Sequence, residues 1–310
     1  MNLFSSIFPY TTKNEIPADI NERLNNFAFD ELPDGRSKAS GFALLTESDR
    51  AVNANQRYLF KYVEQSRKAN INSVNRLYHQ RLQQATESGR VLTGEEEAVH
   101  REQAEREVLK YAPISESVVF ILYDDRAGRV LCSGGTVKKC EDALKKLRGV
   151  LGNLQTLPLT YELAGKTLAR HLAHHASRPA HHAAHLPEWL HIPAQGKVVA
   201  TDDGQKATFD GIDVRGDGLR DVIGGMEVRA VEMELCERAG DGKRKVLASF
   251  VVHLPEKGNL HLKGYDFDGS RTEKSGDAAH DYAVTMHIIA TDVWRVLLGL
   301  QTFFSGQPGH

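Results

Sequence analysis

The hydrophobic positions of this 310-residue chain change their period several times, and each period predicts a different element. Val118–Tyr123 and Arg129–Cys132 are apolar runs on either side of the short, polar, Gly-containing segment 124–128. This arrangement is typical of a β-hairpin. Apolar residues then return at helical spacing, and Thr136 stands where it can cap the helix that they predict.

The predicted helix has one apolar and one basic face. Its apolar stripe must pack on a sheet, which leaves the basic face turned outward. The stripe consists of Val137, Cys140, Ala143, Leu144, Leu147 and Leu151. Opposite it lie Lys138, Asp142, Lys145 and Lys146, with Lys139 and Arg148 on the flanks.

The first part of the chain predicts strands and helices in turn. Strands are expected at Leu3–Tyr10, Gly41–Leu45 and Arg57–Val63, and a short helix at Ala18–Phe27. A second helix is expected to begin at Asn72 or Ser73, and a third to follow the capping box Thr93–Glu96 and run to about Tyr111. The third helix is mostly polar, so these two helices predict an arm that projects from the body.

The last third of the chain alternates with the period of strands. Strands are predicted at Lys197–Ala200, Ala207–Ile212, Val231–Leu235, Val246–Leu254, Leu260–Leu262 and Tyr282–Ile289, and a helical turn at Gly218–Ile223. Thr291 is predicted to cap a final helix.

Charge is distributed unevenly along the chain. The formal net charge is only −2, but residues 50–148 carry 18 basic and 13 acidic side chains, whereas residues 1–49 carry 4 and 8. Local potential steers a polyanion more than net charge does, so the middle of the first half is the candidate for contact with nucleic acid. Eight basic residues are the candidate DNA contacts: Arg76, Arg81, Arg90, Arg101, Lys138, Lys139, Lys145 and Lys146.

Other chemistry has weaker support. The sequence has no run of about 18 apolar residues, which argues against a membrane helix, and no secretory signal pattern is expected at its start. The three cysteines, Cys132, Cys140 and Cys236, are expected to be buried thiols in a reducing cytosol. Seven histidines cluster in residues 171–191, yet no acidic or Cys ligand except Glu188 lies near them, so no functional metal is predicted.

Three classes of function remain open on these residues alone. The first is a DNA-binding protein without chemistry of its own, which contacts phosphates through spaced Lys and Arg side chains. The second is a Mg²⁺-dependent nuclease, for which Asp266 with Asp268, or Asp124 with Asp125, are the best carboxylate pairs. The third is an interaction scaffold that binds proteins only, in which the basic residues merely keep the surface soluble.

The helical segment and its neighbours resemble the bacterial RdgC family of recombination-associated proteins. The residues that carry the resemblance are Lys138-Lys139, Glu141-Asp142, Leu144, Leu147-Arg148, Leu151-Gly152, Leu157-Pro158-Leu159, Phe4 to Tyr10, Gly41-Phe42, and a strand–Thr–helix pattern over Asp281 to Leu300. The resemblance is weakest over residues 161–215, in the His-rich segment and in the acidic stretch Asp202, Asp203, Asp210, Asp213 and Asp217.

The resemblance implies a function without catalysis. RdgC-like proteins form a ring-shaped homodimer that encloses double-stranded DNA with little sequence preference and restrains the RecA recombinase. It therefore implies no cofactor, no enzymatic activity, duplex DNA and a second copy of the chain as partners, RecA as a functional antagonist, no membrane, and a cytoplasmic, nucleoid-associated location. The arm near Arg90 and the hairpin near Asp124 are candidate subunit contacts.

We therefore expect an α+β protein with antiparallel sheets and packed helices, whose curved, multi-subdomain monomer forms a ring-shaped dimer. The expected parts are an N-terminal α+β body (1–72 and 112–160), a projecting helical arm (73–111), a His-rich helical linker (161–195) and a C-terminal α+β domain (196–310).

Overall fold

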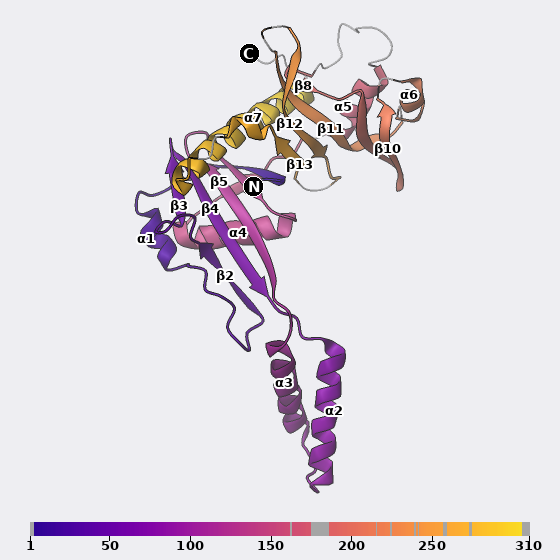
Figure 1. The fold of residues 1–310 in the computed structure, drawn as a ribbon. Coiled ribbons are helices and arrows are strands. Elements are labelled where there is room, and N and C mark those ends of the chain that lie inside the picture. Colours follow the sequence, from indigo (N-terminus) through magenta and orange to yellow (C-terminus); the bar gives the residue numbers. More distant parts are fainter. Residues whose placement is uncertain are drawn as a thin grey trace.

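The computed structural model describes residues 3–161, 163–174, 186–214, 216–223, 225–238, 240, 242–256, 259–272 and 275–305. These residues form an α+β protein built on one large antiparallel sheet, so the predicted fold class is confirmed (Figure 1). The strands, in chain order, are β1 (Ser6–Thr12), β2 (Lys38–Ala43), β3 (Ala51–Ala54), β4 (Arg57–Ser66), β5 (Ser115–Asp124), β6 (Arg129–Ser133), β7 (Thr156–Pro158), β8 (Leu190–His191), β9 (Gln195–Asp202), β10 (Gln205–Asp213), β11 (Glu227–Arg238), β12 (Arg244–His253) and β13 (His261–Phe267).

The helices lie on both sides of this sheet and at its end. They are α1 (Ile20–Asn25), α2 (Ile71–Glu87), α3 (Gly94–Lys110), α4 (Val137–Leu151), α5 (Ala164–His174), α6 (Asp217–Ile223), the one-turn η1 (Gly269–Arg271) and α7 (Ala278–Ser305).

The sheet runs without interruption through both halves of the chain. Its strand order is β10-β9-β11-β12-β13-β1-β6-β5-β4-β2, with β3, β7 and β8 attached at the side of this path. The two halves meet where β1 pairs with β13, with Ser6 opposite Lys263 and Ile7 opposite Leu262. A strand from the start of the chain thus joins the hairpin β5–β6 to the C-terminal strands.

The two faces of the sheet are covered to different extents. One hydrophobic core lies between the sheet and α5, α6 and α7, and it extends from Leu59 on β4 to Val198 on β9. The other core lies between the sheet and α1 and α4, and its residues come only from the first 154 positions, such as Phe8, Ile121 and Leu147. On the part of this second face that β9–β13 form, no helix among the described residues contributes to a core. We call this part of the sheet the open face.

The hairpin and α4 form as their sequence patterns predict. Leu122 on β5 lies opposite Leu131 on β6, and Thr136 Oγ1 accepts a hydrogen bond from Lys139 N at 3.3 Å. The side chains of α4 that are buried against the sheet are Cys140, Ala143, Leu144, Leu147 and Val150. All three cysteines are free and buried, as predicted.

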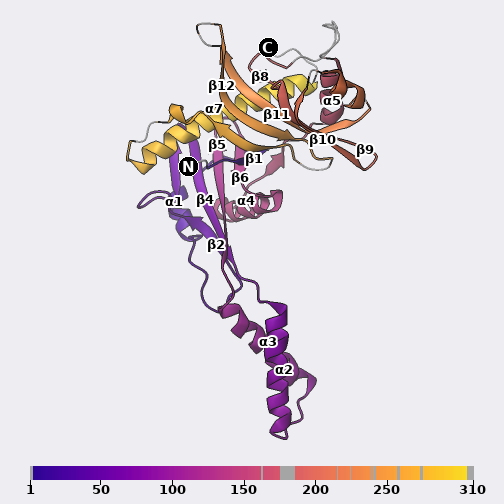
Figure 2. The same cartoon turned by 45° about the vertical axis from the view of Figure 1, so that its right-hand side comes forward.

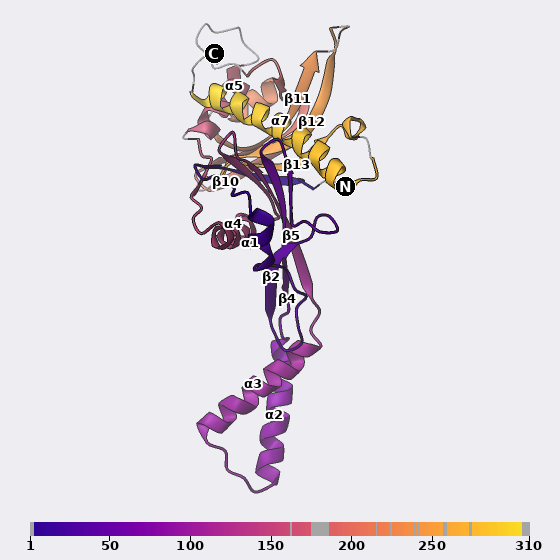
Figure 3. The same cartoon turned by 90° about the vertical axis from the view of Figure 1, so that its left-hand side faces the viewer.

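Helices α2 and α3 project away from the sheet as an arm (Figures 1 and 3). The predicted capping box is confirmed, because Thr93 Oγ1 accepts from Glu96 N and the Glu96 carboxylate accepts from Thr93 N. The start of α2 was predicted one to two residues too late, since Asn70 caps the helix by accepting from the backbone N–H groups of Asn72 and Ser73. Only Val74, Ala104 and Leu109 are buried in these helices.

The prediction for the end of the chain was wrong. Tyr282–Ile289 is not a strand and Thr291 caps nothing: both lie inside α7, which begins after Asp277, whose carboxylate accepts from Ala279 N at 2.9 Å. The apolar run ending in Ile288 and Ile289 was too short to distinguish the period of a strand from that of a helix. The buried residues continue at helical spacing to Phe303. The strand–Thr–helix pattern is therefore absent from this segment.

Helix α7 crosses both halves of the molecule (Figure 1). In the N-terminal half, Trp294 Nε1 donates to Asp124 Oδ2 at 3.2 Å, and Arg57 Nε donates to the same oxygen at 2.9 Å. In the C-terminal half, Arg271 forms a two-pronged ion pair with the buried Asp292. By length and composition alone α7 could cross a membrane, but 56% of its apolar window is buried in the fold, as in the core helix of a soluble protein.

The His-rich segment is described only at its two ends. Helix α5 ends at His174, and β8 pairs with β11 through Leu190 opposite Leu235. His175, His181, His182 and His185 lie outside the described residues.

Candidate nucleic-acid interface

Three lysines of α4 face outward without an acidic partner. Lys138, Lys139 and Lys145 are exposed, and none forms an ion pair with any residue that the structure describes. Lys138 and Lys139 lie in the first turn, where the helix dipole is positive and acidic residues are favoured. No acidic residue occupies that turn, so an anion bound there would relieve the repulsion.

The other two cations of α4 have structural contacts. Lys146 Nζ lies 5.8 Å from the centre of the ring of Phe27, the second residue after α1. Arg148 Nε donates to Leu154 O at 2.7 Å and so closes the turn after the helix. Of the α4 candidates, Lys138, Lys139 and Lys145 are therefore the ones available for a ligand.

The arginines of the arm are mostly engaged within the arm. Arg81 pairs with Glu107 across the two helices and also donates to Gln103. Arg90 pairs with Glu96 at the tip, and the Arg101 guanidinium lies 5.9 Å from the centre of the Tyr78 ring. Arg76 is exposed on α2.

The structure thus splits the predicted set of eight into two groups. Lys138, Lys139, Lys145 and Lys146 lie on α4 against the body, and Arg76, Arg81, Arg90 and Arg101 lie on the arm, which the long strands β4 and β5 carry away from α4 (Figure 2). They do not form one continuous cluster.

The open face contains further basic residues that the sequence prediction did not include. Val198, Val252 and Leu262 point into the core beneath α5–α7, so their neighbours in the strands point to the opposite side, which is the side of α4. The basic members of this set are Lys197, Lys206, Arg229 and Lys263. The alternation of Lys197-Val198 and of His261-Leu262-Lys263 was the signal that could have found them.

Acidic residues neutralise part of this open face. Lys197 pairs with Asp210 at 3.4 Å, and Arg229 pairs with Glu227 at 2.8 Å. Lys206 and Lys263 form no ion pair with the described residues. Farther along β11, burial and the nearby Glu232 raise the pKa of Glu234. The unpaired lysines of the open face are therefore Lys206 on the edge strand β10 and Lys263 on β13, next to β1.

These lysines and those of α4 lie on the same side of the sheet. Strand β6 ends at Ser133, which pairs with Ile7, and Ile7 pairs in turn with Leu262. Helix α4 begins four residues after Ser133. The first turn of α4 therefore starts close to the place where the core beneath α4 ends and the open face begins. Lys263 lies on β13, the first strand of the open face there.

Residues of the acidic stretch, where the family resemblance is weakest, lie at one edge of the sheet. Asp202 and Asp203 occupy the turn of the β9–β10 hairpin, where Asp203 has a φ of 41°. Asp213 ends β10.

The carboxylates considered for a nuclease have other contacts. Asp124 is buried and accepts from Arg57, Trp294 and Ala127 N, so it joins the hairpin to α7 rather than facing solvent. Burial raises the pKa of its neighbour Asp125. The hairpin, proposed from sequence as a subunit contact, is thus held within its own chain through Asp124.

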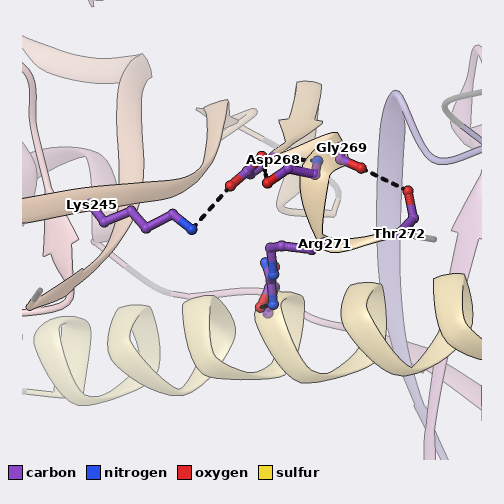
Figure 4. A network of polar contacts seen from close by, with 7 residues as sticks. Lys245, Asp268, Gly269, Arg271 and Thr272 are labelled. Atoms are coloured by element: carbon purple, nitrogen blue, oxygen red, sulfur yellow. Dashed lines mark hydrogen bonds and ion pairs between the residues drawn. The ribbon is translucent and has the colours of Figure 1, made fainter.

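In the second pair, Asp268 also has other contacts. Asp268 accepts from Ser270 N and pairs with Lys245 at 3.3 Å, while Arg271 of the same turn points to α7 (Figure 4). Ser270 and Lys245 hold the pKa of Asp268 below its usual value. Within the part of the chain that the structure describes, no three His, Cys, Asp or Glu side chains are grouped closely enough to hold a metal ion.

A comparison with known families identifies the chain. The family described as "Putative exonuclease, RdgC" matches residues 3–203, which is more than half of the sequence. This protein belongs to the RdgC family. A search of curated proteins finds no match.

The RdgC match includes the hairpin, α4 and the arm, and it ends in the β9–β10 turn. Strands β10–β13 and helix α7 lie beyond it, so four of the five strands of the open face are outside the matched region. The family assignment made from the α4 residues is confirmed.

Proposed function

We propose that this RdgC-family protein binds double-stranded DNA without sequence preference, through lysines on the α4 side of its sheet. The observation that carries the proposal is the set of unpaired cations on that side: Lys138, Lys139, Lys145, Lys206 and Lys263. Side chains of this kind contact phosphates and so give affinity without base readout. No cofactor is needed for such binding.

We further propose that two copies enclose the DNA as a ring-shaped homodimer, which the family resemblance implies. The arm offers a surface for contact between copies, because Val91 at its tip is 92% exposed and Tyr111 at its base is 85% exposed. A closed ring would retain the duplex topologically, whereas a few lysine contacts alone are lost as salt rises.

The proposed consequence is a restraint on RecA. A ring that occupies duplex DNA competes for the substrate of the recombinase and needs no catalytic group of its own. On this proposal the protein is not an enzyme, and it acts in the cytoplasm on the nucleoid.

A gel-retardation series tests the DNA binding. The full-length protein is titrated onto two unrelated duplexes at salt concentrations from 50 to about 300 mM, with and without Mg²⁺. We expect equal retardation of both duplexes and a linear fall of log K with log salt, with a slope of about −0.9 for each phosphate contacted. Sedimentation of the same sample should give the mass of a dimer.

The test separates the proposal from its two alternatives. The printed family description names an exonuclease, so Mg²⁺-dependent shortening of the duplex would replace the binding function with a nuclease. Absence of retardation at the lowest salt would leave an interaction scaffold. Retardation of only one of the two duplexes would contradict the lack of sequence preference.

A further inference from the structure

Three aromatic rings form a continuous stack on the open face of the sheet. The His253 and His261 rings are 4.8 Å apart and 12° from parallel, and the His261 and Phe8 rings are 4.9 Å apart and 19° from parallel. The stack crosses β12, β13 and β1, with His253 opposite His261 in the strand register. It extends the core beneath α4 onto the uncovered strands.

Lysines surround the outer end of this stack. Lys197 on β9, Lys206 on β10 and Lys263 on β13 each oppose a positive charge on His253. On β11 the residue opposite His253 is Ala230, and the nearest carboxylate of that strand, Glu232, accepts from Lys197 N at 3.0 Å. The charge of Glu141 on α4 helps to raise the pKa of Tyr10, which lies on β1 beyond the inner end of the stack.

The imidazoles are held neutral in the free protein. Burial is the main cause, and His261 and the lysines add to it, so that the pKa of His253 falls to about 4. Burial and Lys263 also lower the pKa of His261. Lys206 and Lys263 are exposed and have no acidic partner among the described residues, so the field around the two uncharged rings is positive and favours an anion at this place.

The tautomer of His261 shows where a proton would go. Asn259 O is 3.2 Å from His261 Nδ1, and a carbonyl can only accept, so Nδ1 carries the hydrogen. The Nε2 atom is then the basic nitrogen. A proton taken up there would turn it into a donor for an anionic oxygen.

We propose that the His253–His261 stack, with Lys206 and Lys263, is a proton-linked binding site for a DNA phosphodiester. The lysines around the stack attract the phosphate, and the charge of the phosphate stabilises one imidazolium, so binding takes one proton from solvent. Only one of the two rings is charged, because two stacked cations would repel each other. This inference rests on the proposed DNA binding and adds a second contact area to that of α4.

The site makes DNA affinity depend on pH in a defined direction. Above neutrality both rings stay neutral and only the lysines contribute. As the pH falls below about 6.5, the bound form gains a proton that the free form still excludes, so the affinity rises. A bound-state pKa near the ordinary histidine value corresponds to about a tenfold gain between pH 7.5 and pH 5.5.

The test measures binding of the full-length protein to one short duplex at pH 5.5, 6.5 and 7.5 and constant ionic strength. We expect the affinity of the native protein to rise about tenfold over this range. The double variant His253→Gln and His261→Gln should vary less than about twofold. The matched control is His280→Gln, because His280 is exposed near the start of α7, the helix that packs on the other face of the sheet, and it should keep the tenfold rise.

Calorimetry on the native protein gives an independent measurement that needs no variant. Binding at pH 6 in two buffers of different ionisation enthalpy should show uptake of about three-quarters of a proton per chain. No proton uptake, or an equal pH dependence in the double variant, would overturn the histidine site while leaving DNA binding by α4 intact. Absence of DNA binding at every pH would overturn both the site and the proposed function.

Discussion

The arm and α4 carry similar numbers of basic residues but present them differently. On the arm, Arg81 and Arg90 are paired with Glu107 and Glu96, and Arg101 lies over an aromatic ring. On α4, none of the four predicted lysines has an acidic partner among the described residues, and three of the four are exposed. A count of basic residues alone treats the two regions as equal, whereas the glutamates of the arm, several of which pair with its arginines, leave only α4 strongly attractive to a polyanion.

The difference reflects how each region is stabilised. The arm buries few apolar side chains, so its helices depend on local interactions such as the capping box and the pairs between α2 and α3. Helix α4 is held by its apolar stripe against the sheet, which leaves its outer face free of that task. A surface whose charges are not needed for folding can be used for binding.

The largest expected effect comes from neutralising the free lysines. The triple variant Lys138→Gln, Lys139→Gln and Lys145→Gln should bind duplex DNA about a hundredfold more weakly, and the magnitude of the salt slope should fall by about 2.7. Gel retardation over a salt series gives both quantities.

The matched variant removes the same charge from the arm. Arg76→Gln, Arg81→Gln and Arg101→Gln together should change the affinity by less than about threefold, because two of these side chains are already engaged. A loss of equal size in the two triple variants would abolish the proposed difference between the regions.

The second expected effect is a different response of the two regions to acid. The pKa of His253 is lowered to about 4, so the unfolded chain binds more protons below about pH 6.5. Stability from the neutral histidine pair is thus present above pH 6.5 and lost as the pH falls toward 4. After a reduction for solvent screening, we expect the free energy of unfolding to fall by about 1–2 kcal/mol over this pH range.

The arm should respond only at lower pH. The backbone N–H of Thr93, with Arg90, holds the pKa of Glu96 below its usual value, so the cap persists until the pH falls through that lowered value. Hydrogen exchange measured by region should therefore show β12 and β13 loosening before α3. The reverse order would contradict the assignment.

The third effect is confined to the arm. Thr93→Ala removes both the acceptor for Glu96 N and part of the site that holds the Glu96 side chain, and it should lower the local stability of α3 by about 1 kcal/mol. We expect faster amide hydrogen exchange in α3 and unchanged exchange in α4. Thr86→Ala, which removes a hydroxyl in α2 that caps nothing, should not have this effect.

The smallest effect runs in the opposite direction. Glu96→Gln with Glu107→Gln frees Arg90 and Arg81 from their carboxylates, and DNA affinity should rise about threefold at low salt. The double variant Glu97→Gln and Glu105→Gln is the control, since it removes two charges from α3 that pair with no arginine among the described residues. An equal gain in both variants would show that net charge, and not pairing, decides the affinity of the arm.

The sequence by itself determined the local elements whose signals need no distant partner. The hairpin before α4, the Thr136 cap and the Thr93–Glu96 capping box are all present as predicted, because turn residues, caps and periodic burial act over a few positions. The family could be recognised from the same local pattern around α4.

Only the tertiary structure decided which face each residue shares with residues far away in the chain. Residues 282–289 became part of α7 because a core from both halves covers one face of that helix, and their eight positions could satisfy either period. Lys263 joined the side of α4 through the pairing of β1 with β13, and Arg81 was neutralised by a glutamate 26 positions later. Such long-range pairings depend on register and packing, which no local window of the sequence contains.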